Sequence, residues 1–154
     1  MPDFESFDGL RLSYLDDGDG RVVVLLHGFA ADTNVNYVRS GILDLLLDEG
    51  YRVVTLDARG HGLSSKPTDP EAYADDAMKR DVVALFDHLG LDDVLLVGYS
   101  MGAHLALRLA PSSPPVPDSP RNNPQSRSTF TIPRCITSMK SAGFAGSAAR
   151  SGDA

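Results

Sequence analysis

The chain of 154 residues has no tryptophan and a single cysteine, Cys135. One cysteine excludes an internal disulfide, so a small secreted fold held together by disulfides is ruled out. The longest apolar runs span about five residues, far too few to cross a bilayer, and the N-terminus lacks the basic start and apolar core of a secretory signal. We therefore expect a cytoplasmic protein that does not associate with a membrane.

Charge and composition divide the chain into two parts. Residues 1–110 hold 9 Lys and Arg against 19 Asp and Glu, whereas residues 111–154 hold 5 against 2. An acidic body gives no reason to expect nucleic-acid binding, and the basic residues of the second part are too sparse to form a binding patch. The second part also carries seven of the ten prolines and nine serines without apolar periodicity. We expect residues 111–154 to be a disordered tail, in which Phe130–Ile132 is at most a short strand before Pro133.

The first part alternates between strand and helix patterns. Continuous apolar runs predict strands buried on both faces, and apolar residues at helical spacing predict helices that end near Gly50 and Gly90. The expected strands are 21–26, 51–56 and 94–97, and the expected helices are 35–49, 74–89 and 101–110. Asp8-Gly9 predicts a two-residue hairpin between strands 4–7 and 10–14. The alternation indicates an α/β fold with a mostly parallel sheet, right-handed crossovers and an N-terminal antiparallel hairpin.

The most informative motif is Gly98-Tyr99-Ser100-Met101-Gly102, which follows a strand and opens a helix. A sharp strand-to-helix turn of this kind raises a serine hydroxyl above the sheet edge, and crowding requires glycine two positions before and after it. The helix N-terminus directs backbone N–H groups at the place where an oxyanion would develop. The strand and helix around it distinguish this pattern from a chance match in a loop, and we take Ser100 as the candidate nucleophile.

A second motif, His27-Gly28-Phe29-Ala30, ends the strand 21–26. Gly28 allows a tight turn that brings the N–H of Phe29 toward Ser100, and an oxyanion hole of this architecture takes its other N–H from the residue after the nucleophile, Met101. We interpret His27 as a structural residue that bonds the loop backbone rather than as the catalytic base.

A third motif runs from Asp57 to Ser64 after the strand 51–56. Its glycines indicate a turn with unusual backbone angles. We expect Asp57 to pair with Arg59 and Ser64 to bond the loop, which makes this motif part of the pocket wall. A proton-accepting role for His61 is the less favoured interpretation.

These three motifs, in this order and spacing, resemble the N-terminal part of an α/β-hydrolase-fold protein over residues 4–110. The resemblance implies the first five strands and helices A to C of that fold, with Ser100 as nucleophile and the Phe29 and Met101 amides as the oxyanion hole. It implies esterase-type hydrolysis of a small ester or related acyl substrate, without metal or cofactor. Serine at the tip of the turn argues against relatives with an aspartate nucleophile, such as epoxide hydrolases and haloalkane dehalogenases.

The acid and the histidine base of a serine triad are both missing from the pattern. In α/β hydrolases the acid and the histidine follow the serine, but after Ser100 the chain has only Asp118, Asp153 and His104, and His104 lies on the flank of the following helix. We therefore expect a truncated hydrolase-like chain with low or no activity. The alternatives are a working hydrolase whose base comes from an unrecognised arrangement or a partner chain, and a non-catalytic module whose Pro-rich tail recruits a partner. The strand 94–97 would form an uncovered sheet edge, which favours self-association.

Overall fold

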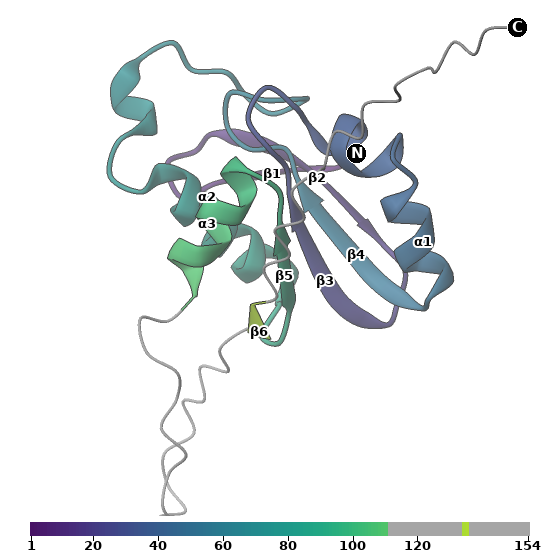
Figure 1. Ribbon diagram of the computed structural model, residues 1–154. Coiled ribbons are helices and arrows are strands. Elements are labelled where there is room, and N and C mark those ends of the chain that lie inside the picture. Colours follow the sequence, from purple (N-terminus) through teal and green to yellow (C-terminus); the bar gives the residue numbers. More distant parts are fainter. Residues whose placement is uncertain (111–133, 136–154) are drawn as a thin grey trace, which may run out of the picture.

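The structure is a computed structural model that describes residues 1–110 and 134–135 (Figure 1). Apart from those last two residues, the tail expected at 111–154 lies outside the described part of the chain, as does the short strand considered at Phe130–Ile132. Within the described residues six strands form one sheet in the order β1-β2-β4-β3-β5-β6. The strands are β1 (Asp3–Glu5), β2 (Arg11–Asp17), β3 (Arg21–Leu26), β4 (Tyr51–Leu56), β5 (Leu95–Gly98) and β6 (Arg134–Cys135).

The sheet is mixed, with an antiparallel hairpin at one end and a parallel part at the other. Strand β1 pairs antiparallel with β2, and β2 antiparallel with β4. Strand β3 runs parallel to both β4 and β5, and β5 runs parallel to β6. The parallel α/β architecture expected from the sequence is therefore confirmed. The observed bounds of β3 and β4 equal the predicted ones: β3 is an apolar run after Arg21, and β4 is buried from Val53 to Leu56.

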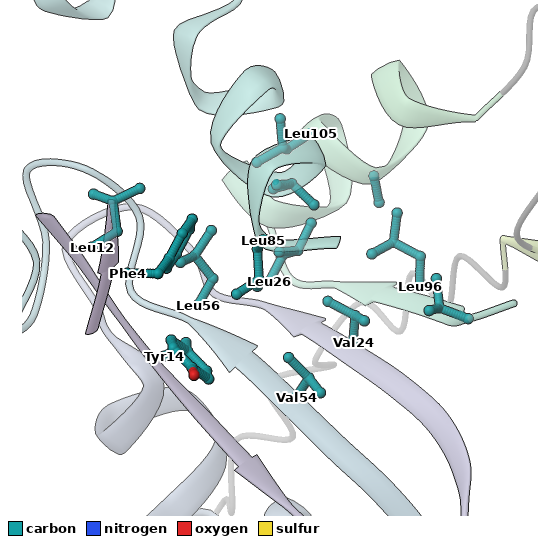
Figure 2. Packing of buried hydrophobic residues seen from close by; sticks show 13 residues of the cluster. Phe4, Leu12, Tyr14, Val24, Leu26, Val54, Leu56, Leu85, Leu96 and Leu105 are labelled. Carbon is teal, nitrogen blue, oxygen red and sulfur yellow. The ribbon is translucent and has the colours of Figure 1, made fainter. Parts of the chain in front are cut away.

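Helices cover both faces of the sheet. Alternate residues of β3 divide between two apolar clusters, because successive side chains of a strand point to opposite faces. Val24 and Leu26 pack under α2 (Ala77–Leu89) and α3 (Met101–Leu109), as Figure 2 shows for part of that cluster. Val23 and Leu25 pack on the other face, beside α1 (Ile42–Asp48). Strand β3 is thus the centre of a three-layer core (Figure 1).

The prediction of one continuous helix over residues 35–49 is wrong. The segment is a π-helix, η1 (Asn34–Val38), followed by a break at Gly41, whose φ of 75° lies in the left-handed region, and then by α1. The phase of the buried face changes across this break. Four of the apolar side chains behind the prediction are exposed, namely Val35, Val38, Ile42 and Leu45, whereas a fifth, Leu46, is half-buried against the core. Tyr37 and Leu43 are buried in their place.

The N-terminal hairpin is confirmed, but its loop is longer than the two residues expected. Strand β1 ends at Glu5 and pairs there with Arg11, and the turn is closed by a hydrogen bond from the Gly9 N–H to the Ser6 carbonyl. Strand β2 continues through Asp16, whose carboxylate binds Arg52 of β4 in a bidentate pair at 2.7 Å. The cross-strand ion pair lies beyond residue 14, where the strand predicted from the sequence ends, and supports the longer strand.

Two further elements differ from expectation. The helix predicted from residue 74 starts at Ala77, after a short 3₁₀ helix, η2 (Pro70–Tyr73). The expectation that 94–97 forms an unpaired edge is wrong over two residues, because Leu95 and Leu96 of β5 pair with Arg134 and Cys135 of β6. Among the described helices, none has the length and apolar composition that spanning a bilayer would require.

Candidate active site

Ser100 occupies a sharp turn between β5 and α3. Its φ of 51° and ψ of −111° lie outside the regions that residues with a side chain normally adopt. The side chain is exposed at the C-terminal end of β5, where the parallel strands of the sheet terminate. Such strained positions cluster at functional sites, so the observed angle supports the turn that the Gly-x-Ser-x-Gly pattern predicts.

Both glycines of this turn are packed against backbone. A Cβ atom on Gly98 would collide with the carbonyl group of Gly102 and the amide of Ala103, and a Cβ on Gly102 would collide with the carbonyl of Leu26. Neither glycine has a positive φ, so glycine is required here by space alone. Strand β3, the turn and α3 therefore approach more closely than any side chain would allow.

The loop after β3 lies against the same turn. A Cβ atom on Gly28 would come within 2.8 Å of the Tyr99 ring and 3.4 Å of the Ser100 Cβ atom. The next residue, Phe29, carries a backbone N–H that meets no acceptor within residues 1–110 and 134–135. The N–H of Met101 is likewise without an acceptor in that part of the chain, as expected for the first residue of a helix. The structure thus brings Gly28, Phe29, Ser100 and Met101 together at one sheet edge.

His27 is buried, and both of its ring nitrogens bond backbone atoms. Its Nδ1 lies 2.8 Å from the carbonyl oxygen of Gly28, and its Nε2 lies 3.0 Å from the amide nitrogen of Ala58, which can only donate. The proton therefore sits on Nδ1, which donates to Gly28. Burial lowers the pKa of His27 and keeps the ring neutral. The structural role expected for His27 is confirmed.

The motif from Asp57 to Ser64 forms the neighbouring loop. The buried Asp57 carboxylate accepts the N–H groups of Thr33 at 2.9 Å and Leu63 at 2.8 Å. The Ser64 hydroxyl donates to the Asp57 carbonyl and accepts the Ser13 N–H at 2.8 Å, so its expected bonding role is confirmed. The His61 ring lies 5.1 Å from the His27 ring, centroid to centroid, and its Nδ1 bonds the Arg59 carbonyl at 3.0 Å.

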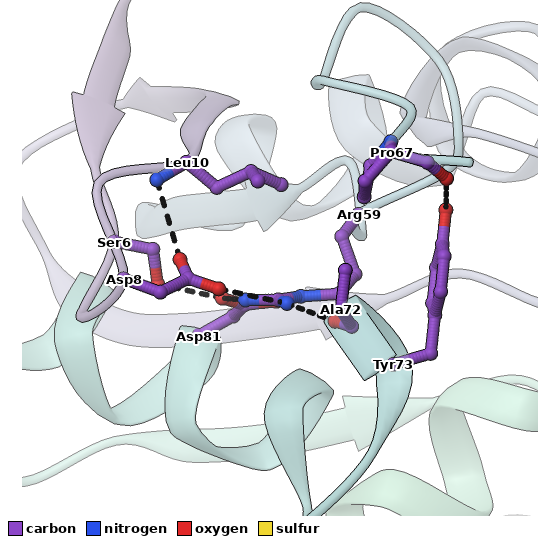
Figure 3. Close-up of polar contacts among 8 residues, drawn as sticks. All are labelled: Ser6, Asp8, Leu10, Arg59, Pro67, Ala72, Tyr73 and Asp81. Carbon is purple, nitrogen blue, oxygen red and sulfur yellow. Dashed lines mark hydrogen bonds and ion pairs between the residues drawn. The ribbon is translucent and has the colours of Figure 1, made fainter. Parts of the chain in front are cut away.

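The expected pair of Asp57 with Arg59 is wrong. Arg59 turns into the interior and binds Asp81 of α2 through Nε at 2.7 Å and Nη2 at 2.6 Å (Figure 3). Its Nη1 reaches Asp8 at 3.0 Å and also bonds the Ala72 carbonyl. The Ser6 hydroxyl donates to the Asp81 carboxylate at 2.6 Å. We call this cluster of Ser6, Asp8, Arg59, Ala72 and Asp81 the Arg59 network.

Sequence reasoning missed two side chains that bond these loops, those of Asp81 and Asn36. Asp81 had a signal, because it lies four residues from both Ala77 and Leu85 on the apolar face of α2, where an unpaired charge is costly. Asn36 had no such signal. Its side-chain oxygen accepts the Gly28 N–H at 2.8 Å, and no sequence pattern predicts that an asparagine makes such a bond.

No histidine ring of the described residues is bonded to Ser100. Three of the rings have other partners: His27 and His61 as above, and His88, whose Nε2 lies 3.3 Å from the Tyr14 hydroxyl. His104 is exposed on α3, one turn after the serine. Within residues 1–110 and 134–135, no group of three or more metal-binding side chains is found. The described site therefore supplies a presented hydroxyl and two N–H donors.

Large apolar side chains are exposed on the turn and on the loops after β3 and β4. Phe29, Leu63 and Tyr99 are 76%, 64% and 63% exposed, and Phe29 packs edge-on against His61 at 5.7 Å between ring centroids. Tyr99 precedes Ser100 and Phe29 follows Gly28, so these two side chains give the surface beside Ser100 an apolar rim, which suits the carbon chain of an organic substrate better than a charged group.

Comparison with known proteins gives one consistent result. The family model described as alpha/beta hydrolase fold matches residues 21–118. The chain is 38% identical over 107 residues to a haloalkane dehalogenase of Mycolicibacterium paratuberculosis, which covers 68% of this chain and 35% of that protein. It is 42% identical over 111 residues to the mouse sn-1-specific diacylglycerol lipase ABHD11, covering 70% of this chain and 34% of the lipase.

Solved structures agree. The esterase EaEST from Exiguobacterium antarcticum superposes with a TM-score of 0.61 at 35% identity, covering 69% of this chain and 38% of the esterase. The epoxide hydrolase VrEH1 from Vigna radiata gives a TM-score of 0.60 at 34% identity, covering 69% and 35%. The chain thus spans about a third of the length of the proteins it matches.

Proposed function

The chain belongs to the α/β-hydrolase fold family, and from that membership we propose that Ser100 is the nucleophile of a hydrolase that cleaves small esters. The observation that carries the proposal is the backbone at Ser100, which is held at a φ of 51° between β5 and α3 beside two N–H groups that lack an acceptor in the described residues. Backbone strain at an exposed serine is typical of a turn that presents the hydroxyl to a substrate.

The proposed reaction is acyl transfer. The Ser100 oxygen attacks the ester carbonyl carbon, the hydroxyl proton passes to a base, and the carbonyl oxygen becomes an oxyanion. The N–H groups of Phe29 and Met101 donate to that oxyanion. The base returns its proton to the departing oxygen as the carbon–oxygen bond breaks, and loss of the alcohol leaves an acyl-serine that water hydrolyses. Each such donor is worth about 10²–10³ in turnover in comparable sites. The apolar rim of Phe29 and Tyr99 supports an apolar acyl or alcohol group in the substrate.

The identity of residue 100 favours an ester over other substrates of the family. Relatives include proteins named as a haloalkane dehalogenase, epoxide hydrolases, an esterase and a lipase. Dehalogenases and epoxide hydrolases of this fold attack with an aspartate, and this chain has serine at the turn. Serine suits acyl transfer through an ester intermediate, which is the chemistry of the esterase and lipase group.

We further propose that the 154-residue polypeptide alone turns over slowly. The described residues offer Ser100 no histidine base, and the chain spans about a third of the length of its relatives. Loss of the base from a serine triad lowers turnover by about 10⁶, and about 10³–10⁴ over water remains from the oxyanion hole and binding.

A fluorophosphonate probe tests the proposal, because it reports nucleophilic attack without requiring turnover. We expect slow labelling of the 154-residue chain at Ser100, located by mass spectrometry of the labelled peptide, and none in Ser100→Ala. Ser65→Ala is the matched control, since Ser65 is half-buried in a loop and keeps the reactive turn intact. Equal labelling of Ser100→Ala, or no labelling of the unaltered chain at high probe concentration, would overturn the assignment.

A further inference from the structure

Gly28 is the point at which the loop after β3 approaches Ser100. The Tyr99 ring and the Ser100 Cβ atom occupy the space a side chain would need, so the position must be glycine. Glycine, however, has the widest choice of backbone angles of any residue. If the Gly28 backbone rotated freely, the N–H of the next residue would not stay directed at a reacting atom. Such precision matters because a displacement of about 1 Å costs about 10² in rate.

Two side chains remove that freedom. The Asn36 Oδ1 atom accepts the Gly28 N–H at 2.8 Å, and the His27 Nδ1 donates to the Gly28 carbonyl at 2.8 Å. The peptide planes on both sides of the Gly28 Cα atom are thus each held by a hydrogen bond. The His27 ring is itself fixed, because its Nε2 accepts the Ala58 N–H at 3.0 Å.

The second of these bonds orients the Phe29 N–H. No cis peptide bond occurs in the described residues, so the N–H of Phe29 points opposite to the Gly28 carbonyl. Because that carbonyl points at the His27 ring, the Phe29 N–H points to the opposite side, away from the ring. Donation from His27 to the carbonyl also polarises the same peptide group and strengthens its N–H as a donor.

Asn36 is placed by the π-helix η1. Its neighbour Tyr37 is buried and donates from its hydroxyl to the Leu26 carbonyl at 2.6 Å. Consecutive residues of η1 therefore bond the end of β3 and the loop that follows it. Single π turns within helical segments are frequent at functional sites, and here the turn delivers an amide to Gly28.

We infer that Asn36 and His27 are positioning residues that fix the Gly28–Phe29 peptide so that its N–H faces the substrate oxygen bound at Ser100. This inference rests on the proposed function for the substrate oxygen, but the orientation of the peptide is a property of the chain alone. The two statements can therefore be tested separately.

Amide NMR tests the orientation. In Asn36→Ala we expect the order parameter of the Phe29 N–H to fall from about 0.85 to below about 0.6, since one of the two restraints is lost. Asn34→Ala is the matched control, because Asn34 lies in the same η1 but is exposed, and it should leave the value unchanged. An unchanged order parameter in Asn36→Ala would overturn the inference.

The protonated nitrogen of the His27 ring provides a second test. It is measured on the unaltered chain, so the test does not depend on whether a variant of this buried residue folds. Long-range ¹H–¹⁵N spectra should show the neutral ring protonated on Nδ1. A ring protonated on Nε2 could not accept the Ala58 N–H, and that result would overturn the role of His27.

Fluorophosphonate labelling then tests the link to the reaction. We expect Asn36→Ala to label at Ser100 about 10-fold to 100-fold more slowly than Asn34→Ala, at a temperature at which thermal unfolding shows both variants to be folded. Equal rates would overturn the positioning role. If the unaltered chain is not labelled, the proposed function fails, and the Phe29 order parameter still decides whether Asn36 and His27 fix the peptide.

Discussion

The carbonyl oxygen of Leu26 occupies the space that a side chain on Gly102 would need. Gly102 lies in α3 with an ordinary helical backbone, so helix propensity alone would favour alanine there by about 1 kcal/mol. Because the obstacle is backbone, the strand and the helix must separate to admit a methyl group. We expect Gly102→Ala to lower the free energy of unfolding by about 1–3 kcal/mol in denaturant titration.

Ala103→Gly is the control for this change. The neighbouring position in α3 is half-buried, and the substitution should cost about 1 kcal/mol through propensity alone. Gly102→Ala more stable than the unaltered chain would contradict the close approach of β3 and α3.

Strain at Ser100 predicts a substitution that stabilises. Ser100→Gly should raise the free energy of unfolding by about 0.5–1 kcal/mol, because glycine tolerates a φ of 51° and a ψ of −111° at little cost. Ser65→Gly, at a position without positive φ, should lower it by a similar amount. Thermal unfolding of the two variants side by side measures the difference. A loss of stability in Ser100→Gly equal to that in Ser65→Gly would show that the turn is unstrained.

The Arg59 network predicts a large effect from one carboxylate. Asp81→Ala leaves a fully buried guanidinium without its main partner and should cost about 3–5 kcal/mol. Asp3→Ala breaks the exposed pair with Arg11, whose side chain is 69% exposed, and should change stability by less than about 1 kcal/mol. Chemical denaturation of both variants provides the comparison, and similar losses would mean that Arg59 is hydrated in solution.

His27 makes stability depend on pH. Burial lowers the pKa of His27 in the folded chain; the neighbouring His61 lowers it further, whereas the Gly28 carbonyl, Asp57 and Asp32 raise it. As the pH falls, His27 therefore binds a proton at a higher pH in the unfolded chain than in the folded chain. The stabilisation is fully present above pH about 6.5 and is lost as the pH falls toward the lowered folded value.

Denaturation between pH 7.5 and pH 5 measures this loss. His27→Gln, which keeps polar atoms near Gly28 and Ala58 and cannot titrate, should flatten the profile above pH 5. An unchanged slope would assign the pH dependence to other groups.

The two helical faces after β3 provide another test. Leu43 is 6% exposed and Leu45 is 60% exposed, although both are leucines of the same short helix. We expect Leu43→Ala to cost about 2–5 kcal/mol and Leu45→Ala less than about 0.5 kcal/mol. Equal losses of stability in the two variants, measured by thermal unfolding, would instead support the continuous helix that the spacing of apolar residues predicts.

Much of the architecture follows from local sequence. Strand β3 is an apolar run buried on both faces, and Gly98 and Gly102 occupy the two positions that a crowded turn around Ser100 demands. Such features are set by residues close together in the chain, and the sequence predicts them well. The helix 35–49 was not predictable in the same way, because the left-handed Gly41 and the π turn η1 shift the phase of its buried face.

Ion-pair partners depend on the folded arrangement rather than on spacing. Asp57 is two residues from Arg59 but serves the N–H groups of Thr33 and Leu63. Arg59 instead binds Asp81, 22 residues away, because α2 packs over the loop after β4. The hydrogen bond between the Gly28 N–H and Asn36 likewise depends on the folded arrangement. Patterns of apolar or charged residues do not predict a bond between one side-chain amide and one backbone N–H.

The Arg59 network has a consequence for the order in which the chain acquires its structure during synthesis. The hairpin turn with Asp8 and the strand before Arg59 leave the ribosome before α2, which carries Asp81. Until that helix arrives, the cation has no buried carboxylate beside it, and enclosing it would cost several kcal/mol. We expect the nascent chain to keep this region hydrated and open to proteases until residue 81 has emerged, and then to close the hairpin, the loop and α2 in one step.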